Sequence, residues 1–67
     1  MAFLVARAGA DPDPGVRVEA LRALAFHWPE ETATASALAA GAAGDEAGEV
    51  REEAARLVGA LAELRAF

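Results

Sequence analysis

The residues with the greatest chemical variety lie together in the stretch HWPEE, from His27 to Glu31. A metal site built on His27 would need further imidazole or thiolate ligands, but the sequence has no second His and no Cys. Acid–base catalysis would need a nucleophile or a substrate pocket beside His27, and the sequence indicates neither. We therefore predict no catalytic, cofactor or metal site, and expect His27 and Trp28 to close a helical hairpin. A pH response of His27 is the alternative.

The carboxylates invite an acid-pair interpretation, because they occur in close pairs at Asp11 with Asp13 and at Glu30 with Glu31. Each pair stands before an apolar-periodic run, where acidic side chains satisfy the free N–H groups of a helix start and favour its dipole. Capping is therefore the predicted role. The small-residue segment GAAGDEAGE, residues 41–49, lacks the Gly-x-x-x-x-Gly-Lys pattern of a phosphate-binding loop and is expected to be a turn.

Composition limits the classes of function. The chain has 67 residues and a net charge of −5, and all six basic residues are Arg. An acidic chain without a basic stripe disfavours nucleic-acid binding, and no apolar run approaches the roughly 20 residues that span a bilayer. The opening MAFLVARAGA lacks the basic start of a signal peptide, so it is expected to be a mature helix. These features favour a cytoplasmic protein, and the absence of Cys is compatible with that expectation.

The sequence repeats itself at the offset that places Leu4 on Leu38. Self-similarity at a period of roughly 20–50 residues is typical of solenoid proteins, in which each unit stacks on the next. Matches at Ala carry little weight in so Ala-rich a chain. The informative matches are Leu4/Leu38, Asp11/Asp45, Val16/Val50, Arg17/Arg51, Glu19/Glu53 and Arg22/Arg56.

Helix signals divide the chain into four helices. The first, about residues 3–8, is expected to bury Phe3, Leu4 and Ala8. The second begins at Pro14 after an Asp13 N-cap. Its expected inward residues are Val16, Ala20, Leu24 and either His27 or Trp28.

The third helix is expected over about residues 29–43, opened by Pro29 and ended by Gly41 and Gly44, with Leu38 as its one large apolar residue. The fourth is expected from about Glu46 to Arg65 and onward to Phe67. It carries a continuous apolar seam of Val50, Ala54, Leu57, Leu61 and Leu64. The large residues of this seam, Val50, Leu57, Leu61 and Leu64, are either core or a partner-binding surface, and the sequence leaves these two roles evenly balanced.

The pattern Asp-x-x-Pro-x-Val-Arg-x-x-Ala-x-x-Ala-Leu resembles HEAT repeats, especially the short variety also found in phycobilisome-lyase-like proteins. In this sequence it runs from Asp11 through Pro14, Val16 and Arg17 to Leu24. The second copy keeps Asp45, Val50, Arg51 and Ala54 but has Gly48 in place of Pro14 and Leu57 in place of Ala23. The length of the period also suits tetratricopeptide repeats, but the chain lacks their Trp–Leu–Gly–Tyr series.

This resemblance implies an all-α fold, an α-solenoid fragment of antiparallel helical hairpins with about one and a half to two HEAT-like repeats. Residues 1–10 would be the helix end of a preceding repeat, 11–44 the first full repeat, and 45–67 an incomplete or capping repeat. It also implies an inter-repeat ladder in which an Arg hydrogen-bonds the turn Asp of its neighbour, pairing Arg51 with Asp11 or Arg17 with Asp45. An anion site at these arginines is the alternative.

The predicted function is therefore a protein–protein interaction or scaffold module without catalytic activity. Its predicted partner is another protein or the neighbouring repeats of a longer chain, and self-association is a further alternative, because so small a core has marginal stability. The alternative function, implied by the resemblance alone, is a subunit or fragment of a lyase-like HEAT protein that handles a tetrapyrrole chromophore.

Overall fold

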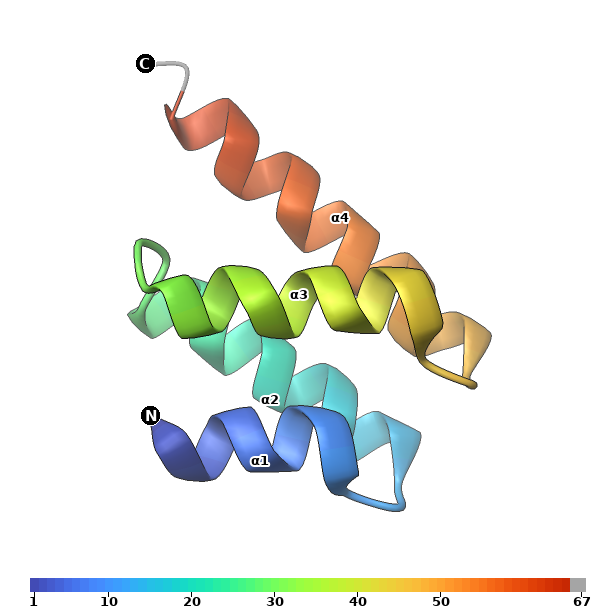
Figure 1. Cartoon of the computed structure of the whole chain (residues 1–67). Helices are drawn as coiled ribbons and strands as arrows, with labels where there is room; N and C mark the ends of the chain where they lie inside the picture. The colour runs from blue at the N-terminus through green and yellow to red at the C-terminus, as the bar shows by residue number, and fades with distance from the viewer. Residues whose placement is uncertain (66–67) are drawn as a thin grey trace.

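The computed structural model of the chain describes residues 1–65, which form four α-helices and no strand (Figure 1). This confirms the prediction of an all-α chain with four helices. Helix continuation to Phe67 lies outside the described residues. The helices are α1 (Ala2–Ala10), α2 (Pro14–His27), α3 (Thr32–Gly44) and α4 (Gly48–Arg65).

The helices lie in two layers, one formed by α1 and α2 and the other by α3 and α4. Consecutive helices run in opposite directions and pack against each other, α1 with α2 and α3 with α4 (Figure 1). The second pair sits on the first, so that α3 packs against α1 and α4 packs against α2. The repeat boundaries expected from the sequence lie between residues 10 and 11 and between residues 44 and 45. They therefore fall in the short turn that joins the two helices of each pair, where the two copies of the sequence motif begin.

The helix starts follow local capping chemistry. The Asp13 side chain accepts a hydrogen bond from the Gly15 N–H at 2.8 Å, and Pro14 opens α2, as expected. The prediction that α3 begins at Pro29 was wrong. The chain first makes a turn in which the Glu31 N–H donates to the Trp28 carbonyl at 3.3 Å, and α3 begins at Thr32.

The start of α4 also differs from the prediction. The Asp45 side chain accepts a hydrogen bond from the Ala47 N–H at 2.9 Å, which holds the chain in a turn across Glu46. The helix consequently begins at Gly48, two residues later than expected. Asp side chains that bond the backbone two residues ahead favour such turns over helix.

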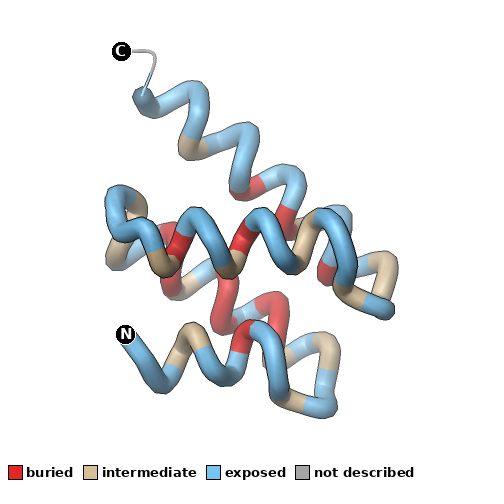
Figure 2. Tube along the Cα trace, in the orientation of Figure 1, coloured by how far each residue is buried: buried red, intermediate tan, exposed pale blue. Residues whose placement is uncertain are grey.

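The core lies between the two layers (Figure 2). The predicted inward set was partly wrong. Phe3 is 67% exposed and Val16 only half-buried, whereas Val18 and Leu21 are buried. A single helical stripe underestimates the buried face of α2, because this helix contacts all three others. The buried apolar residues are Ala8, Val18, Ala20, Leu21, Leu24, Ala25, Leu38, Val50, Ala54 and Leu57.

Small residues let α3 approach its neighbours closely. A Cβ atom added to Gly41 would lie 3.2 Å from the Ala54 Cβ and 3.4 Å from Leu21 Cδ1. Gly41 does not end α3, as the sequence had suggested, but lies inside it. Its missing side chain therefore lets α3 pack closely against α4 of its own pair and α2 of the other.

We predict opposite effects for two substitutions at helical glycines. Gly41→Val places a branched side chain against Ala54 and Leu21, and should lower the free energy of unfolding by about 1–3 kcal/mol. Gly59→Ala is the matched control, since a Cβ there meets nothing within 4 Å. It should raise stability by about 0.5–1 kcal/mol through helix propensity. Urea unfolding followed by circular dichroism measures both, and equal effects would contradict the packing argument.

Candidate functional site

A bidentate ion pair joins the two helix pairs. Arg17, on α2, donates from Nε and Nη2 to the two carboxylate oxygens of Asp45, in the turn before α4, each at 2.9 Å. Both side chains are largely buried, with 6% and 9% of their surface exposed. Two parallel N–H···O bonds to a carboxylate fix the relative orientation of the groups as well as their separation.

The surrounding hydrogen bonds are repeated in the two halves of the chain. The Asp11 carboxylate accepts from the Asp13 N–H at 2.9 Å, and Arg17 Nη1 donates to the Asp11 carbonyl at 2.7 Å. In the second half, Asp45 accepts from the Ala47 N–H at 2.9 Å, and Arg51 Nη1 donates to the Asp45 carbonyl at 2.7 Å. The repeat seen in the sequence thus corresponds to the same local geometry in both halves.

Of the two ladder pairings considered from the sequence, the structure brings together Arg17 and Asp45. Arg51 does not reach Asp11, whose carboxylate instead binds Arg7 at 2.8 Å on the same chain segment. Each of the three nitrogen atoms of the Arg17 guanidinium donates a hydrogen bond to a protein oxygen. An anion at Arg17 would therefore require the ion pair to open, whereas Arg51 is exposed and donates to the Asp45 carbonyl.

Electrostatics keep this pair charged. The hydrogen bonds from Arg17 lower the pKa of Asp45, although burial opposes the shift. The same hydrogen bonds raise the pKa of Arg17. Both partners therefore stay ionised at neutral pH.

A second cluster lies further along the same junction. Glu53, on α4, accepts from Arg22 Nε of α2 at 2.8 Å and also binds Arg56. These two arginines lower the pKa of Glu53 to about 2, Arg56 contributing most. Arg22 also donates to Glu19 at 3.0 Å. Sequence reasoning gave these residues no role, although Glu19/Glu53 and Arg22/Arg56 are matches of the repeat.

The apolar seam of α4 divides into two parts. Val50 is fully buried and Leu57 is 9% exposed, so both belong to the core. Leu61 is half-buried, and Leu64 is 66% exposed. The part of the seam beyond Leu57 therefore remains accessible.

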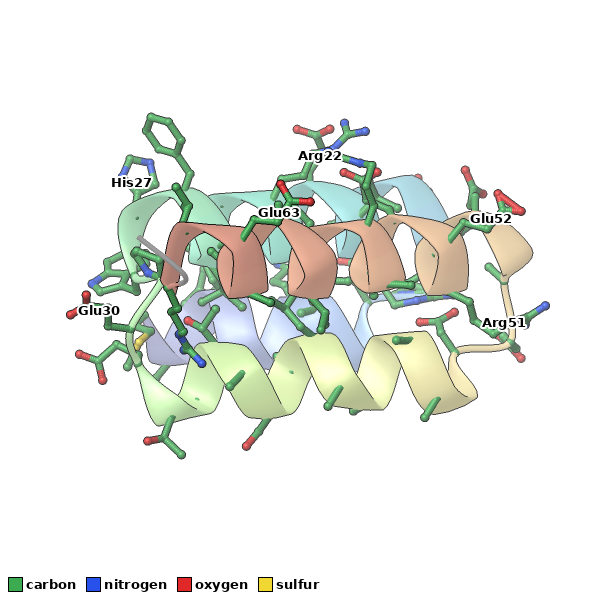
Figure 3. All side chains as sticks on the ribbon, turned by 90° about the horizontal axis from the view of Figure 1, so that it is seen from above. Arg22, His27, Glu30, Arg51, Glu52 and Glu63 are labelled. Atoms are coloured by element: carbon green, nitrogen blue, oxygen red, sulfur yellow. The ribbon has the colours of Figure 1, made fainter. Side chains whose placement is uncertain are left out.

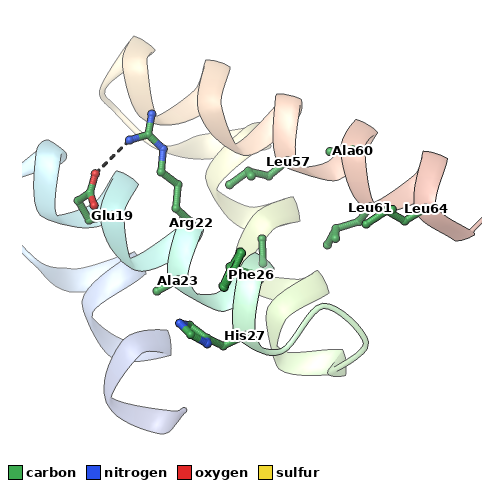
Figure 4. A pocket seen from close by; sticks show the side chains of 10 residues that line it. Glu19, Arg22, Ala23, Phe26, His27, Leu57, Ala60, Leu61 and Leu64 are labelled. Atoms are coloured by element: carbon green, nitrogen blue, oxygen red, sulfur yellow. Dashed lines mark hydrogen bonds and ion pairs between the residues drawn. The ribbon is translucent and has the colours of Figure 1, made fainter.

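This accessible part forms one wall of an open groove of about 520 Å³ between α2 and α4 (Figure 4). The opposite wall is α2, which presents Phe26 with 81% of its surface exposed. Sequence reasoning missed Phe26 because it lies outside the inward stripe of α2. The apolar lining residues are Ala23, Ala25, Phe26, Leu57, Ala60, Leu61 and Leu64.

His27 lies at the edge of this groove. It is exposed, and its ring meets that of Phe26 edge to face at a centroid distance of 5.0 Å. Trp28, in contrast, is half-buried and packs against the core, as one of the two residues expected to point inward. Although His27 aligns with Leu61 in the repeat, it is a surface residue.

Within residues 1–65, no three His, Asp or Glu side chains are grouped so that they could hold a metal ion. Over the same residues, no helix combines the length and apolarity needed to cross a bilayer. The candidate site is therefore the pair of features described above, the ladder and the groove. Comparison with known proteins gives no match, whether to a protein-family model, a curated protein or a solved structure.

We predict that Arg17→Met destabilises the chain much more than Arg51→Met. The first substitution strands the buried carboxylate of Asp45, whereas the second removes one hydrogen bond of an exposed side chain. The two arginines occupy the same position of the repeat, so Arg51→Met is a matched control. Thermal unfolding measures the difference, and equal losses would show that the buried pair does not hold the halves together.

We predict a stability change at acid pH that depends on Glu53. Its pKa is lowered in the folded state to about 2, from an ordinary value of 4.5. Between these values the unfolded chain binds more protons, so the stabilisation is complete above pH 4.5 and is lost as pH falls towards 2. Glu53→Gln should therefore show a shallower fall in urea midpoint from pH 5 to pH 2.5. A slope equal to that of the unsubstituted chain would contradict this assignment.

Proposed function

We propose that the chain is a protein-interaction module of HEAT-repeat type, without catalytic activity, and that the groove between α2 and α4 holds a helix of a partner protein. The carrying observation is the position of Phe26 and Leu64, which are strongly exposed on the two walls of one apolar groove. Exposed apolar groups that gather in a groove favour a binding site, because their burial against a partner removes them from water.

The repeated turn geometry supports the HEAT-type part of the proposal. In both halves an Asp accepts from the N–H two residues ahead, and an Arg six residues on donates to its carbonyl. An Arg of the first half also pairs with the Asp of the second. This Arg–Asp pairing is one of the two that the resemblance to HEAT repeats implied, and it supports the proposal.

The charges around the groove favour a basic partner. Glu19 lies on its rim, and Glu30 and Arg65 line a smaller hollow beside Leu61 and Leu64. Arg22, the basic residue of the rim, is bound by Glu19 and Glu53. The net charge of −5 adds a negative field to the whole surface. We therefore commit to an amphipathic helix with an apolar face and Lys or Arg flanks, the helix-in-groove mode of recognition.

We predict that such a helix binds at this groove. The probes are two synthetic helical peptides of equal length with one identical Leu-rich face, one flanked by Lys and the other by Glu. In a titration followed by NMR, the Lys peptide should shift the amide signals of Phe26, Leu57, Leu61 and Leu64, and the Glu peptide should bind at least about tenfold more weakly.

Matched variants locate the binding. Phe26→Ser should abolish the shifts, because it removes one apolar wall without touching the buried core. Val58→Ser is the control, since Val58 is also exposed on α4 but does not line the groove. The proposal fails if neither peptide shifts the groove signals, or if Phe26→Ser leaves binding unchanged.

A further inference from the structure

The two ends of the stack carry complementary charged groups. The junction inside the chain uses two donors on the first half, Arg17 and Arg22, and two acceptors on the second, Asp45 and Glu53. At the same positions of the repeat, the second half carries the donors Arg51 and Arg56, and the first half carries the acceptors Asp11 and Glu19. We call the face with Arg51 and Arg56 the upper face and the face with Asp11 and Glu19 the lower face; Figure 3 views the chain from above and labels Arg51.

We propose that a second copy of this chain stacks head to tail on the first, so that Arg51 of one copy binds Asp11 of the next and Arg56 binds Glu19 of the next. The contact would repeat, between chains, the two rungs that join the halves within one chain. The proposal rests on the ladder and is independent of what the groove between α2 and α4 binds.

The donor side of this contact is prepared in the single chain. Arg51 is exposed, and within residues 1–65 its guanidinium makes one hydrogen bond, from Nη1 to the Asp45 carbonyl. The equivalent Nη1 bond of Arg17 orients that guanidinium while Nε and Nη2 bind Asp45. The Arg51 guanidinium is therefore oriented by the same type of hydrogen bond from Nη1, and its Nε and Nη2 donors can bind a carboxylate.

The two acceptors differ: Glu19 is accessible, whereas Asp11 is mostly covered and each of its carboxylate oxygens already accepts a hydrogen bond. The Glu19 side chain is 74% exposed and shares one hydrogen bond with Arg22. The Asp11 carboxylate is 13% exposed and binds Arg7. Arg51 of a neighbouring copy would bind the Asp11 carboxylate together with Arg7. Arg56 of that copy would bind both its own Glu53 and Glu19 of the first copy.

Side-chain sizes at the two faces also match. Inside the chain, Leu21 lies against Gly41, a large residue against one without a side chain. Between copies the equivalent pair is Ala55 against Arg7. The small residue is then on the upper face and the large residue on the lower face, the reverse of the contact inside the chain. The upper face carries Glu52 and Ala55 in place of the buried Val18 and Leu21. Little apolar surface is then buried between copies, and the charged rungs supply most of the attraction.

Two properties follow from this geometry. A head-to-tail contact joins different surfaces, so it leaves one free end on each copy and continues into open chains instead of closing as a dimer. Salt screens the exposed ion pairs and also the repulsion between two chains of net charge −5, so ionic strength acts on the contact in two opposite directions.

The test is sedimentation velocity over a concentration series at low salt. We expect the weight-average mass to rise continuously from that of a single 6.9 kDa chain, without a plateau at two chains. Arg51→Glu and Asp11→Asn should each weaken association at least about tenfold. Asn keeps an oxygen that can accept from the Asp13 N–H, and circular dichroism verifies that each variant is folded.

Arg65→Glu is the matched control, because it makes the same change of charge at an exposed Arg of α4 that belongs to neither rung. It should associate as the unsubstituted chain does. A mass of one chain at every concentration overturns the proposal, as does a plateau at two chains. Association that neither Arg51→Glu nor Asp11→Asn weakens overturns it as well, because the rung needs both groups.

Discussion

The structure depends on the contact between the Arg17 guanidinium and the Asp45 carboxylate. This pair is placed at the turn end of the helices, where each half of the chain has a rigid point defined by its own Asp–backbone bond. An Ala-rich core of this size offers little apolar volume to fix one helix pair on the other. Directional bonds between buried charges set the register that weakly shaped Ala surfaces leave open.

Absent side chains contribute as much to the junction as present ones. The approach of α3 to α2 and α4 requires that position 41 have no Cβ, so Leu21 and Ala54 fill the space. The ion pair orients one helix pair on the other, and Gly41 allows α3 to lie close both to α4 of its own pair and to α2 of the other.

The sequence allowed prediction of the helix count and the Asp13 cap, because periodicity and capping are local signals, whereas the two alternative ladder pairings came from the resemblance to HEAT repeats. Selecting between the pairings required knowledge of which half lies above the other, and this is a tertiary property. The same limit explains Phe3 and Val18. An apolar stripe indicates one buried face, but α2 is covered from several sides and α1 from fewer.

The groove shows the limit in the other direction. The periodic seam of α4 was visible as a pattern, but nothing in the sequence marks where the core stops along it. That point lies after Leu57, because α2 ends at His27 while α4 continues to Arg65. Phe26, unremarkable as one apolar residue near a helix end, became important only when the end of α4 was seen opposite it.

The overhang of α4 has a consequence for local opening. Amide groups near Ala54 lie where α4 packs against α2 and α3, whereas those beyond Leu57 depend mainly on the helix itself. The free energy of opening therefore decreases along α4 towards its end, and hydrogen exchange would follow that gradient. A partner lying in the groove would clamp these last turns, so part of its binding energy would be used to order the helix against which it binds.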